Sequence, residues 1–230
     1  MIAGTDTGVG KTFVGCGLAV ALRHRGLKVA PFKPAESGCE FGSQPHALVP
    51  SDAQKLRYAS QCEAPLETIC PYRFRAPVAP WVAAESTAEP IRVDRLQQCY
   101  QELAFSHNWV LVETAGGILV PLTEHFHYAD LARLLHLPVL LVAASRLGVI
   151  NQVRLTLEYL GNSGIPIIGC VLNHPLSDQT PAVASNSKTL RRLVRHPLYL
   201  VEHAADGQQP QEQAGIQQLA DALVRMLPLS

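Results

Sequence analysis

Short uninterrupted apolar runs alternate along the chain with longer segments in which apolar residues recur every three or four positions. The short runs cover residues 29–32, 109–112, 138–143 and 165–172, and we expect each to form a strand. The longer segments cover residues 11–25, 92–105, 152–160 and 213–226, and their spacing predicts helices. Unbroken apolar strands between amphipathic helices are typical of a parallel sheet buried on both faces. The pattern therefore predicts an α/β fold, doubly wound, with a mostly parallel sheet and helices on both faces.

Composition and charge exclude several classes of protein. The 230 residues are 47% apolar and 17% charged, and nineteen Lys and Arg balance nineteen Asp and Glu. A chain with no net charge does not bind nucleic acid through bulk positive charge, and it is too apolar to be disordered. The length suits one domain or two small ones. Because no long linker interrupts the pattern, we expect a single domain over residues 1–230.

The sequence also bears on the cellular compartment. Six cysteines are scattered without a C-x-x-C pair, which is typical of free thiols in a reducing environment. No apolar run approaches the ~20 residues of a membrane helix, and no basic-then-apolar segment opens the chain. We therefore expect a cytoplasmic protein with no membrane partner. Only three residues precede Gly4, fewer than the roughly five or six of a common strand, so we expect the natural chain to begin upstream of Met1.

A glycine-rich segment directly precedes the first predicted helix and reads Gly4-Thr5-Asp6-Thr7-Gly8-Val9-Gly10-Lys11-Thr12. Glycines let backbone N–H groups turn toward an anion, and a helix N-terminus favours negative charge. We expect Lys11 to reach the β- and γ-phosphates of a nucleotide and the Thr12 hydroxyl to bind Mg²⁺. The usual pattern is G-x-x-x-x-G-K-[ST], whereas here the first glycine stands one residue earlier. The segment predicts a P-loop NTPase-like fold.

Three polar side chains follow apolar runs directly. Lys33 follows the run at 29–32, Glu113 follows the run at 109–112, and Asn173 follows the run at 165–172. Open α/β sheets bind their ligands beyond the carboxyl ends of the strands. We therefore expect these residues to end their strands near the glycine-rich segment.

Four further segments match a known family in order. They are Lys33-Pro34-Ala35-Glu36-Ser37-Gly38, Ser51-Asp52-Ala53, Val112-Glu113-Thr114-Ala115-Gly116-Gly117 and Leu147-Gly148-Val149-Ile150-Asn151. Together with the glycine-rich segment and its displaced first glycine, they resemble the dethiobiotin synthetase family. The resemblance covers the chain from Gly4 to about Asn173.

The resemblance implies an ATP-dependent ligase (a cyclo-ligase) of biotin biosynthesis. The implied reaction joins 7,8-diaminononanoate to CO₂ through a carbamate and a carbamic-phosphoric anhydride, giving dethiobiotin, ADP and phosphate. A carbamate is a poor electrophile because its leaving oxygen is anionic, and phosphorylation turns that oxygen into a good leaving group. The site therefore needs a phosphoryl-transfer apparatus, a carbamate holder and a diamine cradle.

The resemblance also assigns roles to individual residues. Lys11 and Lys33 would stabilise the charge on the carbamate and on the transferring phosphoryl group. Mg²⁺ would be bound by the oxygen ligands of Thr12, Asp52 and Glu113. Ser37, Gly117 and Asn151 would bind the substrate, with Asn151 supplied by a neighbouring subunit, which implies a homodimer. Contacts to ATP are expected from Gly8, Val9, Gly10, Lys11, Thr12, Phe13, Asp52, Glu113, Thr114, Ala115, Gly116 and Asn173, the last through adenine.

Two positions depart from the family pattern. Thr114 stands where the family has glycine, so its backbone is expected to avoid the conformations reserved for glycine. The family's late adenine-contacting segment is not evident around residues 197–203.

Two other functions share parts of this pattern. Regulatory ATPases of the chromosome-partitioning or septum-site type have a related fold, but their phosphate loop carries an early lysine that is absent between Gly4 and Val9. The synthetase half of a glutamine-dependent amidotransferase acting on a corrin ring would need a second domain.

One further cluster has the residue types of a metal site. Glu124, His125, His127 and Asp130 lie close together, and the H-x-H spacing would place both imidazoles on one face of a strand. Because the matching stretch of the family carries no metal ligands, we do not expect metal here.

Overall fold

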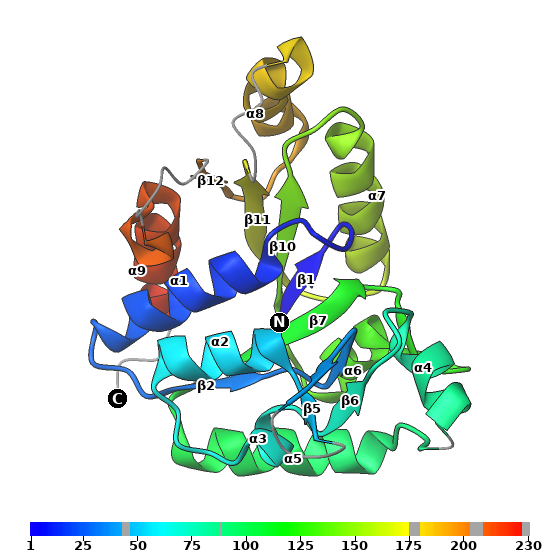
Figure 1. Ribbon diagram of the computed structural model, residues 1–230. Helices are drawn as coiled ribbons and strands as arrows, with labels where there is room; N and C mark the ends of the chain where they lie inside the picture. Colours follow the sequence, from blue (N-terminus) through cyan, green and yellow to red (C-terminus); the bar gives the residue numbers. More distant parts are fainter. Residues whose placement is uncertain (43–46, 88, 175–179, 203–208, 227–230) are drawn as a thin grey trace.

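The computed structural model describes residues 1–42, 47–87, 89–174, 180–202 and 209–226. Within them, a six-stranded sheet forms the centre of the molecule (Figure 1). Its strands follow the order β12 (Leu198–Val201), β11 (Ile167–Asn173), β10 (Val139–Ala144), β1 (Ile2–Gly4), β7 (Trp109–Gly117) and β2 (Val29–Phe32). Each neighbouring pair is parallel. The prediction of a parallel sheet is confirmed, and β1 lies in its interior, between β10 and β7.

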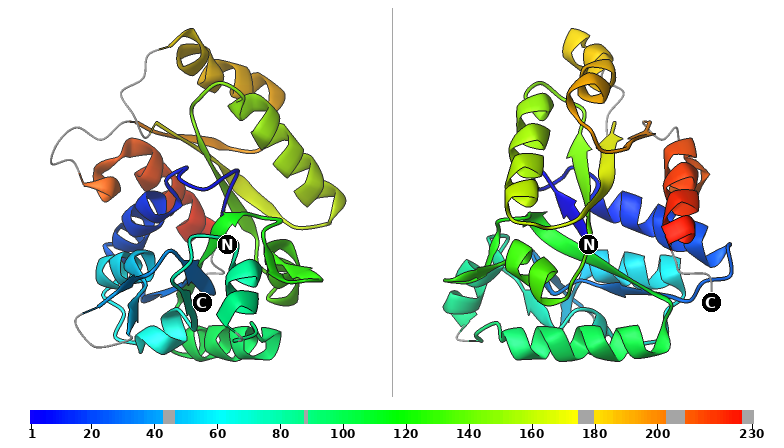
Figure 2. Two further views of the ribbon diagram at one scale, coloured as in Figure 1. Left: turned by 45° about the vertical axis from the view of Figure 1, so that its right-hand side comes forward. Right: turned by 180° about the vertical axis from the view of Figure 1, so that it is seen from behind.

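Helices cover both faces of this sheet (Figure 2). One face packs against α1 (Lys11–Arg23) and α9 (Ala214–Met226). The other face packs against α5 (Val93–Ser106), α6 (Tyr128–Leu134), α7 (Val149–Asn162) and α8 (Pro181–Leu193). Along β10, Leu140 and Val142 enter the first core, and Leu141 and Ala143 enter the second. This alternation of buried apolar side chains explains the unbroken apolar run and confirms the doubly wound fold.

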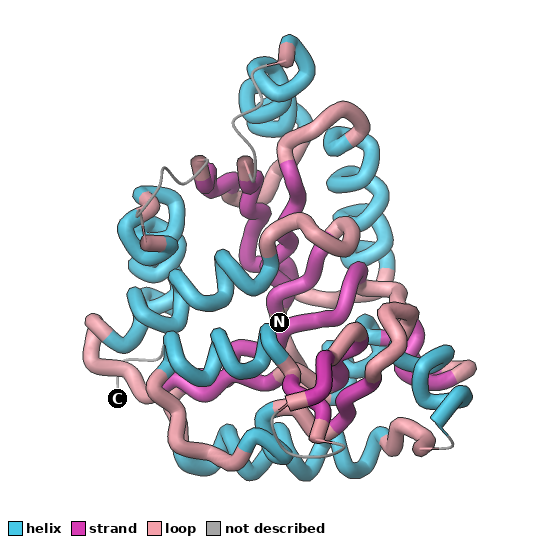
Figure 3. Tube along the Cα trace, in the orientation of Figure 1, coloured by secondary structure: helices cyan, strands magenta, loops and turns pink. Residues whose placement is uncertain are grey.

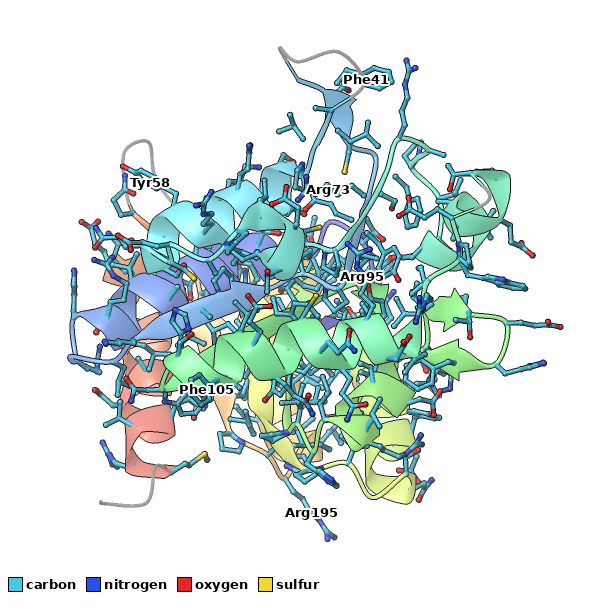
Figure 4. The ribbon with its side chains drawn as sticks, turned by 90° about the horizontal axis from the view of Figure 1, so that it is seen from below. Phe41, Tyr58, Arg73, Arg95, Phe105 and Arg195 are labelled. Carbon is cyan, nitrogen blue, oxygen red and sulfur yellow. The ribbon has the colours of Figure 1, made fainter. Side chains whose placement is uncertain are left out.

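Shorter elements lie outside the six-stranded sheet. There β3 (Ala35–Ser37) pairs with β6 (Tyr72–Phe74), and β4 (Glu40–Phe41) pairs with β5 (Leu48–Val49). The helices α2 (Ser51–Ser60) and α3 (Leu66–Ile69) connect these pairs. After β6 come α4 (Pro80–Thr87) and, beyond β7, the hairpin of β8 (Pro121–Thr123) and β9 (Phe126–His127), while η1 (Pro210–Glu212) precedes α9. Figure 4 shows Arg95 of α5 from below. The guanidinium carbon of Arg95 lies 5.4 Å from the centroid of the Tyr72 ring of β6.

One predicted boundary is wrong in a way that affects the site. Glu113 does not end its strand, because β7 continues to Gly117. The added residues pair with β1, Ile2 opposite Glu113 and Gly4 opposite Gly117. A charged residue and two glycines interrupt the apolar run, but the strand continues through them, with a shift of register between the pairs at Ile2 and Gly4. Glu113 therefore lies in the middle of a strand, where it pairs with Ile2 of β1 and directly follows the last residue paired with β2.

Two further features of the chain are independent of this boundary. All six cysteines carry free thiols. Within the described ranges, no helix combines the length and the apolar composition needed to cross a membrane.

Candidate active site

The glycine-rich segment connects the end of β1 to the start of α1 (Figure 3). Its last residue, Gly10, is the N-cap of α1 at φ 93°, and no side chain caps the helix there. The first turn of α1 also carries no acidic residue. The N–H groups and the positive end of the helix dipole thus face the loop without a carboxylate, which is the arrangement of an anion site.

Two glycines of this loop are required by close contacts. A Cβ on Gly4 would lie 2.7 Å from the Asp6 carbonyl oxygen and 2.9 Å from Lys11 Nζ. A Cβ on Gly10 would collide with the side-chain amide of Asn173. The displaced first glycine of the motif is therefore needed where the chain turns back against its own lysine.

Beside this loop lies a cavity of about 570 Å³. Its walls come from the glycine-rich loop, the segment after β2, the start of α2, the carboxyl half of β7 and the segment that leads into α4. Ten of the residues expected from the sequence line it: Gly8, Gly10, Lys11, Thr12, Lys33, Ser37, Asp52, Glu113, Ala115 and Gly116. The fold thus brings together five sequence segments that lie up to about a hundred residues apart.

A buried charge cluster forms one wall of the cavity. Lys33 Nζ donates to Glu113 Oε1 at 2.6 Å and lies 3.5 Å from Asp52 Oδ2. The Thr12 hydroxyl donates to the same Glu113 oxygen at 2.8 Å. Burial alone would lower the pKa of Lys33, but the carboxylates of Glu113 and Asp52 hold that pKa above its ordinary value. Lys33 therefore stays charged, with its side chain only 4% exposed.

Lys11 is the second buried ammonium group of the cavity. Its Nζ donates to the Asp6 carbonyl oxygen at 3.1 Å, and no carboxylate in the described part of the chain lies within ion-pair distance. Burial, assisted by the nearby charge of Lys33, lowers the pKa of Lys11 to about 8. A cation in this position is stabilised when an anion such as a phosphate enters the cavity.

The oxygen ligands expected for Mg²⁺ converge at this wall. Thr12 and Asp52 lie on either side of Glu113, linked to it directly or through Lys33. The second carboxylate oxygen of Glu113, Oε2, is buried and has no hydrogen-bond partner among the residues described. Hydroxyl and carboxylate oxygens are the ligands that Mg²⁺ prefers, and an unsatisfied buried carboxylate oxygen is stabilised by a cation. The residues present fit the ion.

One functional residue escaped the sequence analysis. Glu36 lies within the Lys33–Gly38 motif, lines the cavity and is 5% exposed. Its carboxylate accepts hydrogen bonds from the backbone N–H groups of Asp52 and Ala53 at 2.9 and 3.0 Å. Burial raises the pKa of Glu36, although these two N–H groups oppose the shift. The only available signal was a charged residue inside a motif that otherwise tolerates any residue there.

The segment before α4 also escaped prediction. Residues 77–80, read Pro-Val-Ala-Pro, line the cavity together with Thr7 and Val120. The prolines mark a break between elements but carry no chemistry that indicates a ligand.

Six of the expected site residues do not line the cavity: Val9, Phe13, Thr114, Gly117, Asn151 and Asn173. Gly117 pairs with Gly4 in the sheet, and the Thr114 hydroxyl donates to the Gly116 carbonyl oxygen at 2.8 Å. In this motif the left-handed backbone conformation is adopted by Gly116, at φ 73°, and not by Thr114. Thr114 therefore avoids the conformations reserved for glycine, as expected.

Asn173 ends β11 as predicted, and its side chain has a defined partner. Its Nδ2 donates to the Val9 carbonyl oxygen at 3.0 Å, beneath the glycine-rich loop. Asn151 lies in the first turn of α7 and is exposed to solvent. Their expected roles toward adenine and the substrate carboxylate stay predictions.

Comparisons with known proteins bear on this geometry. A family model described as an AAA domain matches residues 1–200. The ATP-dependent dethiobiotin synthetase BioD of Anaeromyxobacter dehalogenans (strain 2CP-C) is 46% identical over 206 residues, which cover 89% of this chain and 90% of that protein. The protein of the same name from Aromatoleum aromaticum is 36% identical and covers 94% of this chain and 95% of its own length.

The chain belongs to the dethiobiotin synthetase family. It is therefore an ATP-dependent ligase. Among solved structures, the septum site-determining protein MinD from Pyrococcus horikoshii OT3, complexed with Mg-ADP, has a TM-score of 0.56 and 17% identity. That alignment covers 96% of this chain and 94% of MinD, and at this identity it shows the shared fold alone.

The histidine-containing segment has a structural role in this dethiobiotin synthetase family member. His127 is the N-cap of α6, and its side chain accepts from the Asp130 backbone N–H. The Asp130 carboxylate accepts in return from the His127 backbone N–H at 2.9 Å. His125 lies 3.8 Å from Glu124 at the exposed tip of the hairpin. The imidazole and carboxylate that looked like metal ligands form a reciprocal helix cap.

Proposed function

We propose that this protein makes dethiobiotin from 7,8-diaminononanoate, CO₂ and ATP. The observation that carries the proposal is one cavity that holds the phosphate-loop lysine, Lys11, together with Lys33 and Ser37. The names of the relatives support ATP as the co-substrate and dethiobiotin as the product, and the diamine and CO₂ are what the resemblance of the motifs implies. Residues of this one cavity would then meet the three predicted requirements, which are phosphoryl transfer, carbamate binding and a diamine cradle.

The proposed sequence begins when one amine of the substrate adds to CO₂ and loses a proton, giving a carbamate. A carbamate oxygen attacks the γ-phosphorus of ATP, and the bond from that phosphorus to the bridging oxygen breaks to release ADP. The second amine then attacks the carbamate carbon, loses its proton and expels phosphate, which closes the five-membered ring. When the P–O and C–O bonds break, the electron pair stays on the departing oxygen, and each lost proton leaves its pair on nitrogen. The reaction therefore needs neither an oxidant nor a reductant.

The residues of the cavity act on charge and position in this sequence. The phosphate loop and the start of α1 bind the triphosphate, and Lys11 stabilises negative charge on it. Lys33 neutralises the carbamate oxygen that attacks, and Ser37 orients the diamine through a hydrogen bond. When bound, Mg²⁺ supplies positive charge at the β- and γ-phosphate oxygens. Thr12, Asp52 and Glu113 would hold it.

The direct test is the dependence of phosphate release on the substrates. We expect release from ATP to require both 7,8-diaminononanoate and bicarbonate, and mass spectrometry of the product to show dethiobiotin. Each substrate is left out in turn as the control. Sustained turnover with ATP alone, unaffected by the diamine, would favour a regulatory ATPase instead.

Changing Glu113 to glutamine is expected to raise the Mg²⁺ concentration that gives half-maximal rate by about tenfold or more. The amide cannot supply the second anionic oxygen, and Oε2 is the oxygen that has no other partner in the described structure. The measurement is a Mg²⁺ titration at saturating ATP. An unchanged titration would remove Glu113 from the metal site.

The proposed homodimer completes the substrate site through Asn151 of a neighbouring subunit. Its exposed position in the first turn of α7 is compatible with such a contact. We expect the protein to elute as a dimer in size-exclusion chromatography at assay concentrations. Full activity from a strict monomer would contradict the shared site.

The six free thiols support a cytoplasmic location.

A further inference from the structure

The helix α2 begins without a capping side chain of its own. Its N-cap is Pro50, which forms no side-chain hydrogen bond to the first turn. Helix starts leave several backbone N–H groups without an intrahelical partner, and a nearby side chain usually accepts from them. At α2 that acceptor comes from a different element, fourteen residues before Pro50 in the sequence.

Glu36 of β3 supplies this acceptor. One of its oxygens, Oε1, accepts from the backbone N–H of Asp52 at 2.9 Å and from the Ser51 hydroxyl at 3.5 Å. The other, Oε2, accepts from the backbone N–H of Ala53 at 3.0 Å. A carboxylate at a helix N-terminus also interacts favourably with the helix dipole. Both oxygens of a buried carboxylate are therefore used to hold the first turn of α2.

This contact joins the two segments that carry the charge cluster. Glu36 stands between Lys33 and Ser37 on one segment, and it binds the backbone of Asp52 on the other. The Asp52 side chain in turn lies 3.5 Å from Lys33 Nζ and lines the cavity. The position of the Asp52 carboxylate thus depends on the start of α2, which is held by Glu36 on the segment that also carries Lys33.

We propose that Glu36 is a positioning residue that sets the Asp52 carboxylate in the site by capping α2. The proposal rests on the proposed function in one respect, which is that Asp52 binds Mg²⁺. Because both Glu36 oxygens already accept from the first turn of α2, we assign the residue to holding Asp52 in place rather than to contact with the substrate. Carboxylates that orient the ligands of a metal commonly change metal affinity or activity by about 10- to 100-fold when they are removed.

The test compares Glu36→Ala and Glu36→Gln with Asp130→Ala. Asp130 is the matched control, because its carboxylate accepts from the start of α6, a helix whose residues are absent from the cavity lining. Hydrogen exchange of the backbone amides is measured on protein without metal or nucleotide. Binding of ATP is measured by calorimetry with Mg²⁺ and, separately, with a chelator.

We expect Glu36→Ala to speed hydrogen exchange at the start of α2. It should weaken ATP binding by about 10- to 100-fold when Mg²⁺ is present and leave binding unchanged when a chelator removes the metal. Glu36→Gln keeps one acceptor oxygen and should fall between wild type and alanine. Asp130→Ala should speed exchange at the start of α6 and leave ATP binding unchanged. Adding Glu36→Ala to Asp52→Asn should cause no further loss of Mg²⁺-dependent binding, because both changes remove the same interaction.

Two results would overturn the proposal. Unchanged exchange in Glu36→Ala would mean that the cap is dispensable. Faster exchange with wild-type binding of Mg²⁺ and ATP would mean that Glu36 only stabilises the helix. Neither readout uses the diamine, so a wild-type protein that fails to make dethiobiotin refutes the proposed function without deciding the role of Glu36.

Discussion

Changing Lys11 to alanine is expected to lower kcat by about 10²- to 10³-fold, the loss that follows when one charge-stabilising group is removed from a transition state. The ammonium group is buried, held against the Asp6 carbonyl oxygen, and not paired with a carboxylate in the described structure. Its pKa is already lowered to about 8 by burial, so the free protein gains nothing from the charge. The charge is useful only when phosphate oxygens are present.

The stability of the protein provides the discriminating readout for this substitution. Because the free protein loses no ion pair, Lys11→Ala should unfold at the same urea concentration as wild type or a slightly higher one. The control is Lys28→Ala, which changes an exposed lysine directly before β2 that is absent from the cavity lining, and it should retain wild-type kcat. A Lys11→Ala enzyme with wild-type kcat would show that the loop lysine does not act in phosphoryl transfer.

The sequence predicted those strands that carry unbroken apolar runs and are covered on both faces. β2 matches its predicted bounds, and β10 and β11 differ by one or two residues. Several elements that escaped explicit prediction, such as β3, α4 and β12, are short and take their stability from their neighbours. β3, for example, is three residues long and exists by pairing with β6. Local periodicity contains no information about such a partner.

The candidate site was predicted where chemistry is local and missed where it depends on distant contacts. The glycine-rich loop is contiguous, so its glycines and lysine could be interpreted from spacing alone. Glu36, by contrast, caps a helix that begins fifteen residues later, and nothing in the sequence between them indicates that contact. Gly117, expected to contact substrate, also pairs with Gly4 in the sheet, a long-range contact that spacing does not reveal, and its role toward substrate stays a prediction.

Changing Lys33 to alanine or methionine is expected to lower both the catalytic rate and the stability of the protein. The rate should fall by about 10²- to 10³-fold, because the ammonium group proposed to stabilise the carbamate is lost. The free energy of unfolding should also fall, by about 3–5 kcal/mol, because Glu113 would be left as a buried charge without its cation. Glu113 is fully buried, and its Oε1 lies 2.6 Å from Lys33 Nζ. Methionine preserves most of the side-chain volume, so a loss shared by both variants reports the charge rather than a cavity.

The double variant Lys33→Met/Glu113→Gln separates the effect on stability from the effect on the catalytic rate. A neutral amide in place of the orphaned carboxylate should restore most of the stability, since replacing both members of a buried pair is often close to neutral. It should restore none of the rate, because the cation and the proposed Mg²⁺ ligand Glu113 are then both absent. Urea unfolding measures the first effect, and phosphate release in the presence of the diamine measures the second. A single Lys33 variant that keeps both its stability and its rate would show that the buried pair contributes to neither the fold nor the reaction. If only the rate survived, the ammonium group would be a structural counter-ion of Glu113, and stabilisation of the carbamate would have to come from Lys11 alone.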